Sequence, residues 1–328
     1  MSQKIPVILD IDTGSDDAVA LITALKAPEL EVKWIATTWG NVPLAEATEN
    51  SLRVLDLARS AGLLAAEIEL YAGAERPLAR DLHEGRRRRD RYSGLIDGEE
   101  VYMHPPILPG RPYTQQAEAQ FAPFKYIDYL SSATEPQTII ATGPLTNLAI
   151  ALSLEPNIVS KIKELIVMGG GYQKANVTPY AEANFWNDPE AVACVLHSGL
   201  KPLLVPLDAT HEAYLRESEY REIFANSGEL GEFCCALLEQ RQKLHDLNQP
   251  LAEPQAVTLH DVLAVCAAFA PQLLSDCLEV HCQICLSAQA NGHLVIDRRE
   301  NPAEANARFA YHADRAAFVA TLTRLFQA

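Results

Sequence analysis

Residues 5–17 read IPVILDIDTGSDD, an apolar run that ends in four carboxylates. The run predicts a buried strand, and Gly14 permits a tight turn into a helix that begins near Asp16. Negative charge is favoured in the first turn of a helix because it complements the helix dipole. Alternation along the strand predicts that Asp10 and Asp12 lie on the same side. Open α/β folds bind ligands at the carboxyl ends of parallel strands, so we expect a site here.

The rest of the chain alternates between strand and helix patterns. Helical periodicity is found over 16–27 and 46–61, and again after 143–147 through Leu152. Short apolar runs predict further strands at 31–38, 67–72, 137–141, 163–168 and 202–207. No repeat or flexible linker divides the chain. We therefore predict an α/β fold with an open, mainly parallel (mixed) central sheet and helices on both faces, a Rossmann-like arrangement in a single domain over 1–328.

The composition excludes several classes of function. The chain has 328 residues, 48% of them hydrophobic, and a formal net charge of -16. A nucleic-acid-binding protein needs a basic surface, which an acidic chain of this kind lacks overall. No stretch of the sequence is long and apolar enough to span a bilayer. The first residues are too short for a signal peptide, and the odd number of cysteines, seven, argues for reduced thiols. We expect a cytoplasmic protein with a small-molecule partner, no nucleic acid and no membrane contact.

The carboxylates at 10–17 require a counter-charge, because four of them repel one another. Hard oxygen ligands favour calcium or magnesium over zinc. An acidic helix N-terminus would explain Asp16 or Asp17 alone, but not four acids after an apolar strand. A phosphatase of the haloacid dehalogenase type also begins with a strand that ends in Asp-x-Asp, although it prefers Thr or Val where this chain has Gly14. The motif by itself leaves that choice open.

The cysteines near residue 280 raise the question of a zinc site. Cys277, Cys282 and Cys285 lie close to His281. We interpret 278–286 as one strand, on which Cys282 and Cys285 point to opposite faces and cannot share a metal.

Four further segments follow the acidic cluster in order. They are Thr38-Trp39-Gly40-Asn41, the stretch ATGPLTN at 141–147, the stretch 168–191 with Asn176 and EANFWNDPEA, and His260-Asp261. Together with the acidic cluster they resemble the nucleoside hydrolase family, the inosine/uridine-preferring type and its bacterial relatives. The resemblance runs from Ile5 to about residue 270, and the order of five segments makes it specific.

The resemblance implies a calcium-dependent enzyme that cuts the N-glycosidic bond of ribonucleosides with water. The implied calcium ligands are Asp12, Asp17, the backbone carbonyl of Thr142, and Asp261. A shell of oxygen ligands suits calcium, and a cation makes water easier to deprotonate. The resemblance assigns the general-base role to Asp12 and makes Asp10 an orienting acid. It also implies a homodimer or homotetramer.

The resemblance further implies a polar cradle for the ribose. Its members are Asp16, Asn41, Asn176, Glu182, Asn184 and Asp261. Amides both donate and accept, as hydroxyl recognition requires, and such a site is expected to reject 2′-deoxyribosides. Asn41 is also placed near the attacking water. His260 is expected to protonate the leaving base, with a packing role as the alternative.

The chain departs from the family pattern on the side of the base. Many relatives have a His-Gly pair shortly before Ser93-Gly94, whereas this chain has only His83 further upstream. Arg241 and His245 stand roughly where relatives offer tyrosines. Trp39 and Trp186 are candidate stacking platforms, although core packing is the commoner use of such residues. Base preference is therefore left open.

An arginine-rich stretch stands apart at 80–91, with Arg80, Arg91 and the run at 86–89. Such a run is usually a solvated loop, and the alternative is a basic lid or a small anion site. It motivates a second function, hydrolysis of another N-riboside such as a modified nucleoside or nicotinamide riboside. A third hypothesis is a ribose- or nucleoside-binding relative without turnover.

Overall fold

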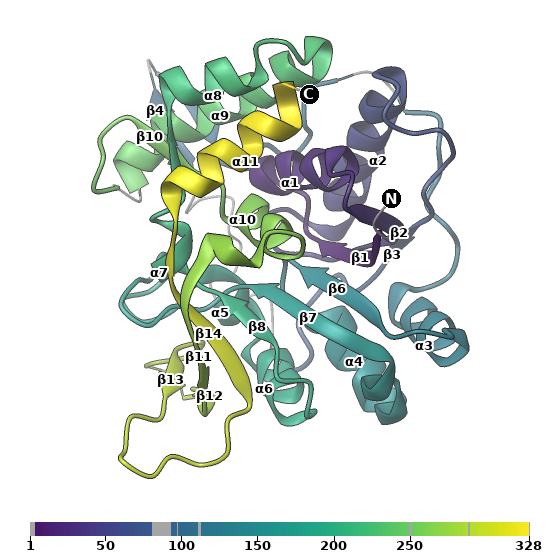
Figure 1. Ribbon diagram of the computed structural model, residues 1–328, viewed down its shortest axis with the longest axis vertical. Helices are drawn as coiled ribbons and strands as arrows, with labels where there is room; N and C mark the ends of the chain where they lie inside the picture. Colours follow the sequence, from purple (N-terminus) through teal and green to yellow (C-terminus); the bar gives the residue numbers. More distant parts are fainter. Residues whose placement is uncertain are drawn as a thin grey trace.

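The computed structural model describes residues 4–80, 93–96, 98–110, 113–248, 251–287 and 289–327. In the described chain, eight strands form a central sheet in the order β11-β14-β8-β7-β6-β1-β2-β3 (Figure 1). Only β11 runs antiparallel to its neighbour, β14. The strands are β1 (Ile5–Ile11), β2 (Leu30–Thr37), β3 (Leu70–Ala72), β6 (Gln137–Ala141), β7 (Ile162–Met168), β8 (Leu203–Val205), β11 (Leu274–Val280) and β14 (Ala307–Ala313). The predicted mainly parallel sheet is confirmed.

Helices cover both faces of this sheet (Figure 1). One face carries α1 (Ser15–Lys26), α2 (Leu44–Ser60), α8 (Glu217–Phe224), α9 (Gly228–Asn248), α10 (His260–Ala267) and α11 (Arg315–Gln327). The other carries α3 (Ala122–Ser132), α4 (Thr146–Leu154) and α6 (Pro189–His197). Val7 and Leu9 of β1 join the first apolar cluster, and Ile8 between them joins the second. This alternation anchors β1 between two cores and fixes where its acidic end lies.

Shorter elements complete the described chain. Three antiparallel pairs are β4 (Ser93–Ile96) with β5 (Glu99–Tyr102), β9 (Tyr214–Arg216) with β10 (Ala256–Thr258), and β12 (Cys282–Ile284) with β13 (Leu294–Ile296). Two short helices are α5 (Ala183–Asn187) and α7 (Leu207–Thr210), and 3₁₀ turns are found at Pro156–Lys161 and Pro271–Leu273.

The predicted strand over 278–286 is wrong. The chain leaves β11 at Val280 and enters β12 at Cys282, because β11 pairs with β14 whereas β12 pairs with β13. Cys285 lies beyond β12, so the opposite-face argument about the two cysteines does not apply. The seven cysteines are free thiols. The strands predicted at 67–72 and 202–207 are also shorter than expected, since only 70–72 and 203–205 pair with neighbours.

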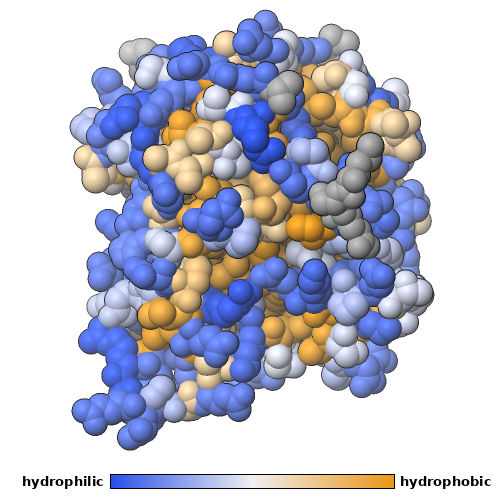
Figure 2. Space-filling view, viewed as in Figure 1, coloured by the Kyte–Doolittle hydropathy of each residue, from blue (hydrophilic) through white to orange (hydrophobic). Residues whose placement is uncertain are grey.

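Polar and charged residues dominate the surface shown in Figure 2, with apolar residues in small groups between them. No helix in the described ranges is long and apolar enough to cross a bilayer.

Candidate active site

The predicted site residues meet because of the strand order. β1 lies between β2 and β6, and β6 pairs with β7 in the same direction. The segments that follow these parallel strands therefore converge at one edge of the sheet. They line one pocket at that edge. Its wall contains the predicted Asp16, Asn41, Thr142, Asn176, Glu182, Asn184, His260 and Asp261.

Asp12 is fully buried and is held by Asn41. The Asn41 backbone N–H donates to Asp12 Oδ2 at 2.6 Å, and Asn41 Nδ2 donates to Asp12 Oδ1 at 3.2 Å. Gly40 permits this approach, because a Cβ at that position would lie 1.9 Å from Asp12 Oδ2. The loop after β2 thus fixes the orientation of the carboxylate that follows β1.

Asp17 lies beside this pair, in the first turn of α1. Its Oδ2 accepts from Asn41 Nδ2 at 2.9 Å and from the Gly14 backbone N–H at 3.0 Å, and its Oδ1 accepts from Thr142 Oγ1 at 2.8 Å. Burial, together with the charge of Asp16, raises the pKa of Asp17 to about 6 despite these hydrogen bonds. One amide, that of Asn41, therefore links two of the buried acids.

Asp10 serves a separate set of partners. Its carboxylate accepts from Tyr126 Oη at 3.0 Å and from Asn147 Nδ2 at 2.9 Å, and Asn147 also binds the Thr37 carbonyl and the Ala74 N–H. Burial raises the pKa of Asp10 to about 7. β1 ends at Ile11, so strand alternation no longer governs Asp12. Asp10 accordingly orients the neighbouring loops rather than Asp12 itself.

Asp261 brings a further acid from the first turn of α10. Carboxylate oxygens of Asp16, Asp17 and Asp261 lie within 4.8 Å of one another. Burial raises the pKa of Asp261 well above its usual range, and the charges of Asp16, Asp17 and Asp12 add to this effect. A buried group of carboxylates favours a cation, and its oxygen donors suit a hard one. The residues present therefore fit a divalent metal ion.

The wall formed after β7 is made of amides and one carboxylate. Glu182 caps α5: its Oε1 accepts from the Asn184 N–H at 2.8 Å, and its Oε2 from the Gly170 and Phe185 N–H groups at 2.9 and 3.1 Å. Asn184 Nδ2 donates to the Thr142 carbonyl at 2.6 Å. Asn176 Oδ1 is buried without a hydrogen-bond partner. An unsatisfied buried acceptor in a pocket wall suits a ligand that brings a hydroxyl.

The opposite wall contains His104, which the sequence pattern did not predict. Its Nδ1 accepts from the Ser15 N–H at 3.3 Å and lies 3.8 Å from Asp16 Oδ1. Gly14 leaves room for it, because a Cβ there would lie 2.1 Å from His104 Nδ1. The only signal in the sequence is its position after the β4–β5 hairpin.

His260 lines the same wall with both ring nitrogens engaged. Nδ1 lies 2.7 Å from Thr210 Oγ1, and Nε2 lies 3.1 Å from Thr258 Oγ1. Thr258 Oγ1 also lies 2.9 Å from His245 Nε2, so His245 is behind His260. Burial lowers the pKa of His260 well below its usual value, and His211 and Arg241 contribute. This shift disfavours the protonated imidazole, and the role of His260 as leaving-group acid stays a prediction.

Comparison with known proteins decides the family. The family model described as inosine-uridine preferring nucleoside hydrolase matches residues 7–320. The chain belongs to this nucleoside hydrolase family. It is a metal-dependent family, and the chain is a hydrolase that acts on N-ribosyl bonds.

Several members of the nucleoside hydrolase family are similar over most of their length. A pyrimidine-specific ribonucleoside hydrolase RihA of Photobacterium profundum is 31% identical over 320 residues, 96% of each chain. The inosine-uridine preferring nucleoside hydrolase of Crithidia fasciculata is 33% identical, over 82% of this chain and 80% of that protein. The solved purine-preferring ribonucleoside hydrolase from Gardnerella vaginalis has a TM-score of 0.83 at 27% identity and covers 98% of both chains.

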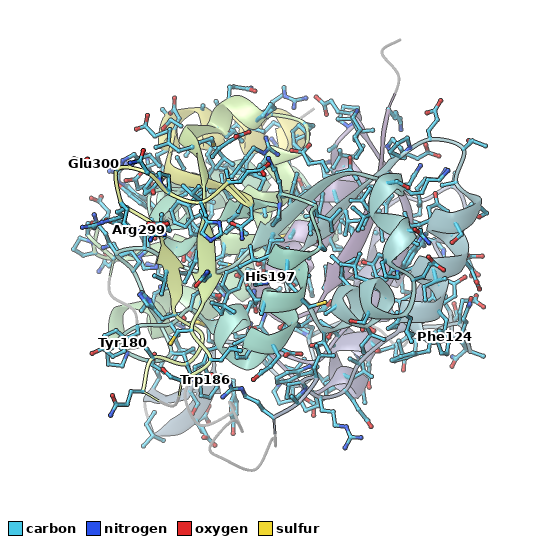
Figure 3. The ribbon with its side chains drawn as sticks, turned by 90° about the horizontal axis from the view of Figure 1, so that it is seen from below. Phe124, Tyr180, Trp186, His197, Arg299 and Glu300 are labelled. Carbon is cyan, nitrogen blue, oxygen red and sulfur yellow. The ribbon has the colours of Figure 1, made fainter. Side chains whose placement is uncertain are left out.

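Other candidate residues of this nucleoside hydrolase lie outside the pocket. Trp39 is buried and its Nε1 donates to Thr146 Oγ1 at 3.3 Å. The backbone of Trp186 lies against Gly292, where a Cβ would come within 2.5 Å of the Trp186 Cα. Trp186 and Tyr180 lie toward the same edge of the molecule in Figure 3. Arg80 pairs with Glu190 at 2.7 Å. His83, Arg91 and the arginines at 86–89 lie outside the described residues.

Proposed function

We propose that the protein hydrolyses the N-glycosidic bond of ribonucleosides to ribose and free base, with calcium as its metal. The observation that carries this proposal is the placement of Asp12. Its two oxygens are fixed by Asn41, which lines a pocket that also contains the Asp16 and Asp261 carboxylates and the amides of Asn176 and Asn184. That arrangement suits a base that accepts a proton from water next to a bound sugar.

Calcium would be held by Asp12, Asp17, the Thr142 carbonyl and Asp261. When bound, it would ease deprotonation of water and offer sites to the sugar hydroxyls. Carboxylate and carbonyl oxygens are its preferred donors. Asp12 and Asp17 follow β1, Thr142 follows β6, and Asp261 joins them from the first turn of α10.

The protein residues would perform the remaining steps. Asp12 takes a proton from water as the water oxygen bonds to C1′, and Asn41 holds Asp12 in the orientation required. The bond between C1′ and the base nitrogen breaks, and its electron pair leaves with the base. The sugar becomes cationic in the transition state, so the surrounding carboxylates stabilise it. We propose that Asp16, Asn176, Glu182, Asn184 and Asp261 bind the ribose hydroxyls.

Protonation of the leaving base remains the proposed role of His260. To act as an acid, the imidazole would first take up a proton, through Thr258 from a protonated His245 or from water in the pocket. It would then donate a proton to the base nitrogen, which returns the ring to its neutral form.

We also propose a homodimer or homotetramer located in the cytoplasm. The free cysteines support a reducing compartment, and light scattering on the purified protein tests the assembly.

The experiment is release of free base and reducing sugar from a panel of ribonucleosides, in calcium and in chelator. Asp12→Asn should lower kcat by about 10³-fold or more while the melting temperature shows a folded protein. Asp56→Asn on α2 is the matched control and should keep native activity. Full activity of Asp12→Asn would exclude the proposed base.

Two other outcomes would favour the alternative functions. Thermal stabilisation by ribose without release of base would indicate a binding protein, and release from a modified riboside alone would indicate hydrolysis of another N-riboside.

A further inference from the structure

Arg241 is a buried cation inside the acidic pocket. It lies on α9, only 1% exposed, where α9 packs beside α1 (Figure 1). Its Nη1 donates to Asp16 Oδ1 and to Ser15 Oγ, both at 2.9 Å, and its Nη2 donates to the Thr258 carbonyl at 3.4 Å. A guanidinium does not lose its proton in proteins, so this positive charge is permanent.

The distances between carboxylate oxygens do not distinguish Asp16 from Asp17 and Asp261, the proposed metal ligands. Oxygens of Asp16, Asp17 and Asp261 lie within 4.8 Å of one another, so each of the three is close enough to share an ion. What distinguishes Asp16 is its partner. Asp17 accepts hydrogen bonds from neutral groups, Thr142, Asn41 and Gly14, whereas Asp16 accepts one from a guanidinium.

We infer that Arg241 is a positioning residue that keeps Asp16 out of the metal's coordination shell and reserves it for the ribose hydroxyls. This inference rests on the proposed function. The guanidinium occupies Asp16 Oδ1 and repels a second cation from that side of the cluster. A metal ion therefore lies toward Asp17 and Asp261, and Asp16 Oδ2, to which no described residue donates, is left for a neutral hydroxyl.

The charge balance supports this arrangement. Asp12, Asp16, Asp17, Asp261 and the wall residue Glu182 bring five negative charges when ionised, and a divalent ion with Arg241 brings three positive ones. Two negative charges remain in the pocket. A sugar that becomes cationic in the transition state is stabilised by that residual charge. If Asp16 and Arg241 were both replaced by neutral residues, the net charge of the pocket would be the same. The effect of this ion pair is therefore to position Asp16, and not to change the net charge of the site.

Calcium binding measured without substrate tests the inference. Calcium is titrated by calorimetry into chelator-treated native protein, Arg241→Met, Arg241→Lys, and the double variant Arg241→Met with Asp16→Asn. Arg53→Met, which removes an arginine paired with Glu49 on α2, is the matched control. We expect Arg241→Met to bind calcium at least ten-fold more tightly than native protein, because a repulsive charge is gone and Asp16 is released. Arg241→Lys and Arg53→Met should stay within about three-fold of native affinity.

The double variant keeps the test decisive if Arg241→Met does not fold. Removing both partners of a buried ion pair is far less destabilising than removing one. The double variant should bind calcium within about three-fold of native affinity and show a raised KM for ribonucleosides with a smaller change in kcat. A ten-fold loss of calcium affinity would identify Asp16 as a ligand and overturn the inference. Unchanged or weaker binding by folded Arg241→Met would overturn it as well.

The same experiments distinguish failure of the inference about Arg241 from failure of the proposed function. Native protein that binds no calcium overturns both the calcium site and this inference, whereas absence of base release by native protein overturns only the proposed hydrolysis of the nucleosides tested.

Discussion

Gly40→Ala is the substitution whose effect follows most directly from the geometry. A Cβ at position 40 would lie 1.9 Å from Asp12 Oδ2, whereas real Cβ atoms essentially never approach a neighbour closer than 3.0 Å. The two atoms must therefore separate by about 1.1 Å. The backbone cannot supply this movement freely, because the same Cβ would lie 2.8 Å from Pro144 Cδ. The Asp12 carboxylate must turn away and weaken its contacts with Asn41.

A displacement of about 1 Å in a catalytic group costs on the order of 10²-fold in rate, or about 2.7 kcal/mol of transition-state stabilisation. We expect kcat/KM of Gly40→Ala to fall by about that factor in the base-release assay, while the protein stays folded by circular dichroism. Gly199→Ala is the control: its φ of +90° strains an alanine, but its Cβ meets no atom within 4 Å. It should lose stability and keep activity. Native-like kcat/KM in a folded Gly40→Ala protein would refute the assignment of Asp12 as the positioned base.

Three further predictions concern pH, metal and the leaving group. The pKa of Asp10 is about 7 in the folded protein and near 3.8 unfolded, so the folded state holds the proton more tightly and stability falls as pH rises from 3.8 to about 7. Between pH 5 and pH 8, native protein should lose about 3 kcal/mol of unfolding free energy relative to Asp10→Asn. If denaturation curves give the same difference in unfolding free energy between the two proteins at both pH values, the prediction is wrong. Chelator should abolish base release, and calcium at 100 times its Kd should restore it and stabilise the protein by about 2.7 kcal/mol; activity that persists after exhaustive chelation would count against the metal. His260→Gln should slow release from ribonucleosides by about 10²-fold or more but spare 4-nitrophenyl riboside, whose phenolate leaves without a proton; equal losses on both substrates would rule out an acid role.

The sequence is most informative where burial and periodicity agree. β1 packs apolar side chains on both faces because it lies between two cores, and four acids at and just beyond its end are hard to account for without a cation. Parallel neighbours of β1 bring Asn41 and Thr142 to the same edge, which is why residues implied by the family resemblance lie in one pocket.

The base side was less predictable because its residues are placed by distant contacts. His104 is positioned by Ser15 Oγ, which donates to the Met103 carbonyl at 2.8 Å, across 88 residues of sequence. The helix that contains Arg241 matches the family pattern only roughly, and the hydrogen bond from Arg241 to Asp16 joins residues 225 positions apart. Local periodicity carries no information about such pairs. The break at His281 was missed for a related reason, since a change of pairing partner leaves the strand-like composition unaltered.

The two walls of the pocket are built on different parts of the scaffold. Asp12, Thr142 and Glu182 follow β1, β6 and β7 and are held largely by backbone and amide donors close to the sheet. His104 and Arg241 come from a hairpin end and from a covering helix. A substitution at His104 leaves the sheet contacts of Asp12, Thr142 and Glu182 in place, so that wall of the pocket can change while the residues that break the bond keep their positions. Such a division fits a family whose members are named for pyrimidines, for purines or as non-specific.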